Sequence, residues 1–200
     1  MVQKMRLIQR LAALCALGTL AACGPDGFVD GVSRTAPVES GVLPDYAVRE
    51  IVVDVPRTLS VSDANLYYPI ADIVWREDLS GDRYLQVQDI FTESAEWGAS
   101  IFDGVQLVDV EIVVTRFHAV TPKARYTVGG VHSMRFELTV RDASTGDVLQ
   151  GPRSVIADLQ SLGGQAAVDA ETQGITQRGR ITQHLAGVLQ RELRAPVPGT

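Results

Sequence analysis

Cysteine is nearly absent from this sequence of 200 residues, which has only Cys15 and Cys23, both near the N-terminus. Cys15 lies in the stretch 11–20, in which every residue is apolar, Gly or Thr. Residues 1–10 carry three basic side chains and no acidic one, and this combination is typical of a secretory signal peptide. We expect residues 1–22 to be removed as a signal peptide, together with Cys15. A lone Cys23 then excludes an intrachain disulfide bond.

Long hydrophobic runs and an excess of basic charge are also lacking. The apolar stretch 11–20 is about half as long as the roughly 20 residues that a membrane-spanning helix requires, so an uncleaved transmembrane anchor is not expected. The sequence has 18 basic and 24 acidic side chains. Loss of Lys4, Arg6 and Arg10 with the signal peptide leaves 15 against 24, a net charge of −9. This balance argues against nucleic acid as a partner and against electrostatic adhesion to anionic lipid.

Motifs for metal binding and catalysis are missing as well. The three histidines, His118, His132 and His184, form no H-x-x-x-H or H-E-x-x-H pattern, and isolated histidines are typical of hydrogen-bonded surface positions. No G-x-S-x-G nucleophile motif is present. The glycine pairs 129–130 and 163–164 lack the Lys and Ser/Thr of a phosphate-binding loop and indicate turns or bulges. We therefore expect a protein that is not an enzyme and binds neither a metal nor a cofactor.

What the sequence does contain is a short motif directly after the apolar stretch. Leu20-Ala21-Ala22-Cys23 resembles the lipobox of bacterial lipoproteins, and the resemblance implies that Cys23 becomes the acylated first residue. Several acyl chains anchor a protein far more firmly than a single myristoyl chain does. In such lipoproteins Gly24, in place of Asp, favours the periplasmic face of the outer membrane. The alternative is an ordinary signal peptide with a chance cysteine beside its cleavage site.

Two segments follow this motif. Residues 23–45 are rich in Gly, Pro, Ser and Asp without an apolar period, which is typical of a flexible linker. The alternative is that Phe28, Val29 and Val32 dock on the following domain and order the segment. Residues 46–194 have the length of a single domain, and residues 195–200 form a C-terminal tail.

The domain has four predicted strands and two predicted helices. Val108, Val110, Ile112 and Val114 alternate with mostly polar residues, and a similar alternation starts at Met134; such patterns are typical of an antiparallel sheet with one buried face. The predicted strands are 48–55, 107–120, 131–142 and, after a break at Gly151-Pro152, 154–159. The predicted helices are 82–102, capped by Ser80 or Asp82, and a final one that is clear from Ile175 onward. A short apolar piece, 73–75, either extends a strand or leads into the first helix.

These elements predict an α+β fold in the order β-α-β-β-β-α. We expect an antiparallel sheet of about four strands, with the two helices side by side on one face, because each helix has a single apolar stripe. The small residues Ser94, Ala95 and Gly98 should let the first helix lie close against the sheet.

A lipobox, a linker and this element order are similar to the auxiliary lipoproteins of ABC-type envelope transport systems, and also to a group of uncharacterised Gram-negative envelope lipoproteins. The transport resemblance implies a non-catalytic partner that helps export machinery bridge the envelope.

One segment of the domain stands out for its chemistry. Residues 121–133 concentrate Lys123, Arg125, Tyr126 and His132 in an otherwise acidic protein. A basic and aromatic loop can hold an anionic headgroup or the carboxylates of a protein partner. The alternative is a twisted hairpin whose charges are simply solvated.

Two functions remain open from the sequence. The first is a lipid-anchored, non-catalytic accessory or interaction component of the envelope, held in the membrane through acylated Cys23 and bound to an envelope protein. The second is a binding module for a hydrophobic or anionic small ligand. A carrier of a hydrophobic ligand needs an apolar cavity of a few hundred Å³, whereas an interaction protein needs a filled core and an exposed patch.

Overall fold

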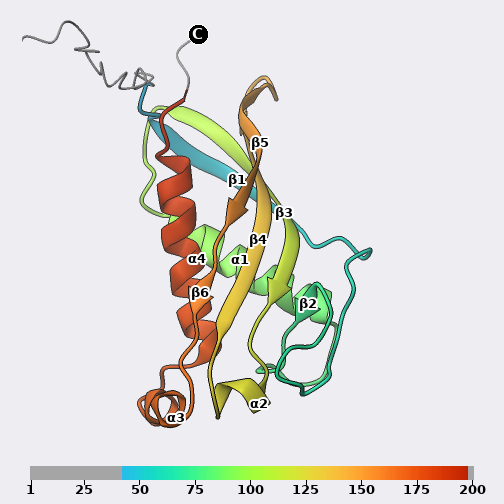
Figure 1. Cartoon of the computed structure of the whole chain (residues 1–200). Helices are drawn as coiled ribbons and strands as arrows, with labels where there is room; N and C mark the ends of the chain where they lie inside the picture. Colours follow the sequence, from blue (N-terminus) through green and yellow to red (C-terminus); the bar gives the residue numbers. More distant parts are fainter. Residues whose placement is uncertain (1–41, 198–200) are drawn as a thin grey trace, which may run out of the picture. The chain divides into compact units, whose positions relative to one another are not determined.

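The computed structural model describes residues 42–197 as an open, mixed β-sheet with four helices (Figure 1). The predicted signal peptide, the lipobox with Cys23, and the linker up to residue 41 lie outside the described residues. The α+β class is confirmed. The strands are β1 (Tyr46–Asp54), β2 (Ile73–Val74), β3 (Gln106–His118), β4 (Val131–Asp142), β5 (Val148–Ile156) and β6 (Leu159–Gln160). The helices are α1 (Arg83–Ala99), α2 (Pro122–Arg125), α3 (Gln165–Thr172) and α4 (Gln177–Leu193).

The main strands are ordered β1-β3-β4-β5, with β2 beside β3 and β6 beside β4. β3, β4 and β5 are antiparallel, as predicted, but β1 runs parallel to β3, with Val48 beside Val108 and Val53 beside Ile112. The expectation of a fully antiparallel sheet is therefore wrong at this edge. Because α1 carries the chain back along the sheet before β3 begins, the next strand starts at the same end as β1 and must run in the same direction.

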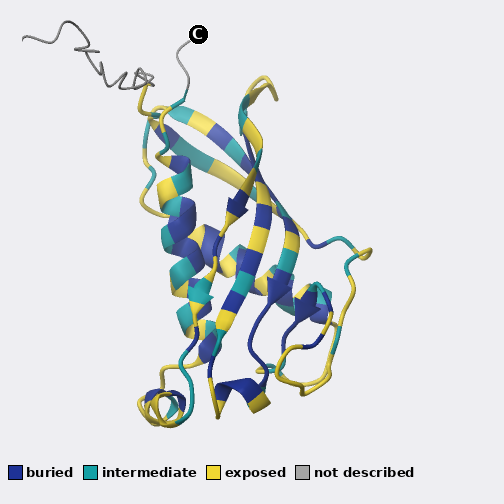
Figure 2. Cartoon of the chain, in the orientation of Figure 1, coloured by how far each residue is buried: buried dark blue, intermediate teal, exposed yellow. Residues whose placement is uncertain are grey.

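One face of the sheet forms the core. Burial alternates along the strands (Figure 2), and the apolar side of β3 and β4 packs with residues of α1 and α4. On the other side, Glu111 is only partly covered and Arg135 is exposed, so that face is open to solvent. The buried side chains of the core face are Val108, Val110, Ile112 and Val114 of β3 and Met134, Phe136, Leu138 and Val140 of β4.

Helix α1 begins as predicted. The Asp82 carboxylate accepts hydrogen bonds from the backbone N–H groups of Tyr84 (2.9 Å) and Leu85 (3.3 Å). The helix ends at Ala99, three residues before the predicted end. Its small residue Gly98 lies against Ala186 of α4 instead of against the sheet. The close approach thus joins the two helices, which pack against each other.

Three features of the fold differ from the prediction. β5 is one strand that continues through Gly151-Pro152. Proline is tolerated there because β5 is an edge strand with a register shift opposite Val140, where a missing N–H costs no ladder hydrogen bond. α2 and α3 were not predicted. α2 has only four residues, and α3 buries only Ala167 and Ala170, so neither has a recognisable apolar period.

Candidate functional site

The side chains singled out in the sequence gather at one end of the sheet, which we call the distal end. β3 begins beside Tyr46 and finishes at His118, and its 13 residues span roughly 40 Å. The described chain starts at the other end, where Val42 pairs with Val197 (Figure 1). The distal end is built from the segment 61–79, α2, α3, the start of α4 and the loops between them.

Arg125 is the centre of an ion-pair network at this end. Its side chain is 8% exposed, and its guanidinium group lies 3.1 Å from the Glu77 carboxylate and 2.8 Å from that of Glu171. Thr121 caps α2 and so sets the direction in which Arg125 leaves the backbone. The structure therefore places Arg125 inside the molecule, where it links two loops that are far apart in the sequence.

Glu77 also occupies the N-terminus of α4. Its carboxylate accepts hydrogen bonds from the backbone N–H of Gln177 (2.8 Å) and from that of Arg178. The hydroxyl of Thr176 accepts from Gly179 (3.0 Å). A carboxylate is stabilised at a helix N-terminus, where free N–H groups and the helix dipole both favour negative charge. Glu77 thus joins α4 to α2 through Arg125.

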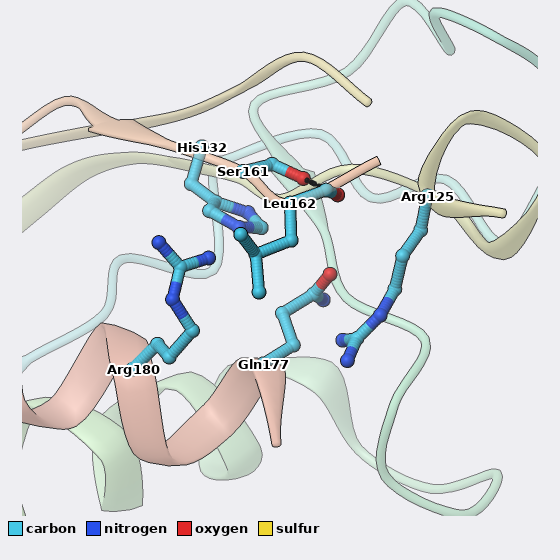
Figure 3. Close-up of a pocket in the computed structure, with 6 residues that line it drawn as sticks. All are labelled: Arg125, His132, Ser161, Leu162, Gln177 and Arg180. Carbon is cyan, nitrogen blue, oxygen red and sulfur yellow. Dashed lines mark hydrogen bonds between the residues drawn. The ribbon is translucent and has the colours of Figure 1, made fainter. Parts of the chain in front are cut away.

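His132 is buried on β4 beside this network. Its ring lies in a narrow space lined by Arg125 and Gln177 on one side and Arg180 on the other (Figure 3). The ring Nδ1 accepts a hydrogen bond from the backbone N–H of Val120 (3.3 Å). Burial, followed by the charges of Arg180, Arg125 and His184, lowers the pKa of His132 to about 3. The ring is therefore neutral at physiological pH.

Lys123 and Tyr126 lie at the surface. The Lys123 Nζ is 4.7 Å from the centre of the Tyr67 ring, a cation–π contact. The Tyr126 hydroxyl donates to Glu171 (2.9 Å), and burial together with this carboxylate raises the pKa of Tyr126. Of the four residues predicted as contacts, two are accessible to a partner and two are internal.

The histidines of the strands are not at surface positions, contrary to expectation. His118 is buried, stacks on Tyr68 with ring centres 4.5 Å apart, and donates through Nε2 to the Pro69 carbonyl (2.8 Å). Within residues 42–197, no group of three His, Cys, Asp or Glu side chains could hold a metal ion. In the same range, no helix is long and apolar enough to cross a membrane.

The segment 61–70 was missed by the sequence analysis. Hydrogen bonds to its backbone hold it against the end of the sheet; Thr121 Oγ1, for example, donates to the Leu66 carbonyl (2.6 Å). Four large side chains remain exposed, and Tyr67, Tyr68 and Val131 line a groove of about 300 Å³. We call this the apolar distal surface: Leu66, Tyr67, Tyr68, Ile70 and Val131. The available signal was a run of large apolar residues, 66–70, that fits no helix or strand.

The two glycine pairs meet at the distal end. A Cβ atom at Gly163 would lie 2.6 Å from the backbone nitrogen of Gly129, so only glycine permits this contact. The N–H of Gly164 donates to the Arg125 carbonyl (2.8 Å). The predicted turns therefore have a joint role, since they bring two loops close enough to position Arg125.

A polar pocket of about 160 Å³ lies next to Arg125. It is bordered by α2, the start of α4 and the segments that carry Glu77 and Glu171. Its polar lining is Arg76, Glu77, Arg125, Tyr126, Glu171 and Gln177, with Val120 and Pro122 as apolar walls.

Comparison with known proteins gives a family. The model of a family of unknown function, DUF6778, matches residues 46–199, and the chain belongs to this family. No curated protein matches the sequence.

Among solved structures, a Xanthomonas campestris protein of family DUF330 is 11% identical, with a TM-score of 0.43, and the match covers 76% of this chain and 85% of that one. A Caulobacter crescentus CB15 protein described as a "putative lipoprotein" is 16% identical, with a TM-score of 0.30 and coverages of 54% and 80%. A third, described as an uncharacterised protein, is 14% identical, with a TM-score of 0.39 and coverages of 76% and 94%.

Proposed function

We propose that this member of a family of unknown function is a lipid-anchored, non-catalytic envelope lipoprotein that binds a protein partner through its apolar distal surface. In this proposal, acylated Cys23 holds it at the periplasmic face of the outer membrane. The partner belongs to an envelope transport or assembly system, of which ABC-type machinery is one class. The support for the anchor is the lipobox-like motif Leu20-Ala21-Ala22-Cys23 behind a short apolar stretch.

The observation that carries the proposal is the distance between the attachment end and the apolar distal surface. Cys23 precedes Val42, and Val42 lies at the opposite end of the sheet from Ile70 and Tyr67 (Figure 1). A protein attached through its N-terminal segment can therefore present the distal surface away from its own bilayer. An accessory protein that reaches across the envelope needs such an arrangement.

The composition of the surface fits a protein partner. Ile70 is 97% exposed, and Tyr67 and Tyr68 are more than half exposed. Aromatic and large apolar side chains are enriched at the centres of protein interfaces and contribute most of their binding energy. Lys123 beside Tyr67 adds a positive charge at the rim, which suits acidic residues of a partner.

The test of the surface is site-specific photocrosslinking in intact cells. A photoreactive amino acid at position 70 should give a discrete adduct with one envelope protein. The same group at position 105, where Val105 is 89% exposed at the opposite end, should not. Purified partner should then bind the wild-type protein and bind Ile70→Asp at least tenfold more weakly, with V105D unaffected. Equal crosslinking at both positions would contradict the proposal.

The anchor is tested separately with Cys23→Ser. The wild-type protein should sediment with membranes and show the mass of an acylated residue 23. The C23S protein should be found in the soluble periplasmic fraction, because the lipid supplies most of the membrane affinity. Retention of C23S in membranes, or an unmodified thiol in the native protein, would rule out lipid anchoring.

A carrier of a hydrophobic ligand is less well supported. The space between the helices and the sheet is filled, with Phe91 packed on Phe136 and Phe117 at ring-centre distances of 5.5 and 6.1 Å. These three side chains are fully buried. An interior of this kind leaves the surface as the place where binding occurs.

A further inference from the structure

Three buried polar atoms at the distal pocket have no hydrogen-bond partner: Nε of Arg76, Nε of Arg125 and Oε1 of Gln177. All three residues line the cavity of about 160 Å³. Arg125 and Gln177 are at least nine-tenths buried, and Figure 3 shows the Gln177 side chain rising from α4 between Arg180 and Arg125. Buried polar groups in folded proteins are nearly always paired, so an unpaired set at one pocket indicates a place for another molecule.

The acidic residues of the pocket are already engaged. Glu77 binds the start of α4 and Arg125, and Glu171 binds Arg125 and the Tyr126 hydroxyl. The hydrogen-bonding capacity that remains is therefore two guanidinium N–H donors and one amide oxygen acceptor. Donors of this kind favour an anionic oxygen, because hydrogen bonds between charged groups are the strongest available in proteins.

Nearby charge strengthens this preference. Arg180 lies close enough to Arg125 for the two positive charges to repel each other, and burial together with that repulsion lowers the pKa of Arg180. Its guanidinium donates to the carbonyl oxygen of Gln160 (3.0 Å), and no described carboxylate pairs with it. An anion in the pocket would reduce the repulsion between Arg125 and Arg180.

We propose that this pocket binds a small carboxylate that carries a neighbouring hydroxyl or amino group. The carboxylate oxygens accept from Nε of Arg76 and Nε of Arg125, and the hydroxyl or amino group donates to Oε1 of Gln177. The volume restricts the ligand to a few heavy atoms, since clefts for drug-sized ligands measure about 300–1,000 Å³. This site is independent of the apolar distal surface.

The experiment is calorimetric titration of the detergent-solubilised full chain with lactate, glycine, acetate and ethylamine. Lactate or glycine should bind saturably. Acetate, which lacks the second group, should bind roughly tenfold more weakly, the equivalent of one good hydrogen bond. Ethylamine, which lacks the carboxylate, should not bind.

Two variants assign the binding to this pocket. Gln177→Leu should abolish the preference for lactate or glycine over acetate while leaving acetate binding unchanged. Arg76→Met should weaken all carboxylates roughly tenfold, and Arg141→Met, on the open face of the sheet, should weaken none of them. Thermal melting of each variant checks that it is folded. The proposal fails if no carboxylate binds, which would mean that water fills the pocket, or if R76M and Q177L bind like the wild type.

Discussion

Gly98 of α1 lies directly against Ala186 of α4: a Cβ atom at position 98 would be 2.8 Å from the Ala186 carbonyl oxygen. The two helices approach closely here because Gly98 has no side chain. Elsewhere in α4, a Cβ atom at Gly187 would meet only the end of the Arg191 side chain, at 3.7 Å. The same substitution should therefore have opposite effects at these two helical positions.

Gly98→Ala should lower the free energy of unfolding by about 1–3 kcal/mol, because the methyl group forces the helices apart. Gly187→Ala should raise it by about 0.5–1 kcal/mol, because alanine has the higher helix propensity and its methyl group has space. Urea denaturation measures both. If G98A stabilises the protein as G187A does, the close contact between α1 and α4 does not exist.

Arg125 should matter far more than an arginine of the open sheet face. Arg125→Met leaves two carboxylates without their shared partner in a partly buried place, and should lower the free energy of unfolding by about 3 kcal/mol. Arg141→Met breaks the exposed pair with Glu111 (2.9 Å) and should leave the melting temperature almost unchanged. Equal effects would show that the Arg125 network is solvated.

His132 should make the protein sensitive to mild acid. Its pKa is about 3 in the folded state and about 6.5 when unfolded, so between these values only the unfolded chain takes up the proton. Stability is complete above pH 6.5 and should fall by about 2 kcal/mol between pH 6.5 and pH 5. The pKa of His184 is also lowered, chiefly by burial, which acts in the same direction.

The control for this prediction is His132→Gln, which keeps a hydrogen-bond acceptor but does not titrate. Its stability, measured by urea denaturation at each pH, should depend less on pH over that range than that of the wild type. Identical slopes for the two proteins would mean that His132 is protonated in the folded state.

Thr176 should stabilise the start of α4. Its hydroxyl accepts from the Gly179 N–H (3.0 Å), which Glu77 does not reach. Thr176→Ala should lower the free energy of unfolding by about 1 kcal/mol, whereas Thr176→Ser keeps the cap and should have little effect. A serine variant as unstable as the alanine variant would assign the loss to packing of the threonine methyl group.

Much of the fold was predictable from local patterns. β3 and β4 have alternating apolar residues, and α1 has both an apolar stripe and Asp82 as its cap, so these elements were placed within a few residues. The short helices α2 and α3 were not predictable in this way, since four residues, or eight with small buried side chains, produce no clear period. The direction of β1 follows from the crossover through α1 but was assigned wrongly.

The candidate site was only partly predictable. The segment 121–133 was singled out correctly as unusual in its charge, but its sequence does not show that Arg125 and His132 are buried while Lys123 and Tyr126 are exposed. Glu77 lies 48 residues from Arg125 and 100 from Gln177, and no local pattern connects them. The apolar segment 66–70 has no period and was missed.

The sequence by itself determined the α+β class, the core face of the central strands, the acidic charge and the lipobox-like motif, because each depends on residue type and short-range spacing. Only the tertiary structure decided the parallel direction of β1, the contact between Gly98 and Ala186, and the assembly of Arg125, Glu77 and Gln177 around one pocket. These depend on where the chain returns in space, since side chains far apart in the sequence acquire their environment only when the helices and loops have packed.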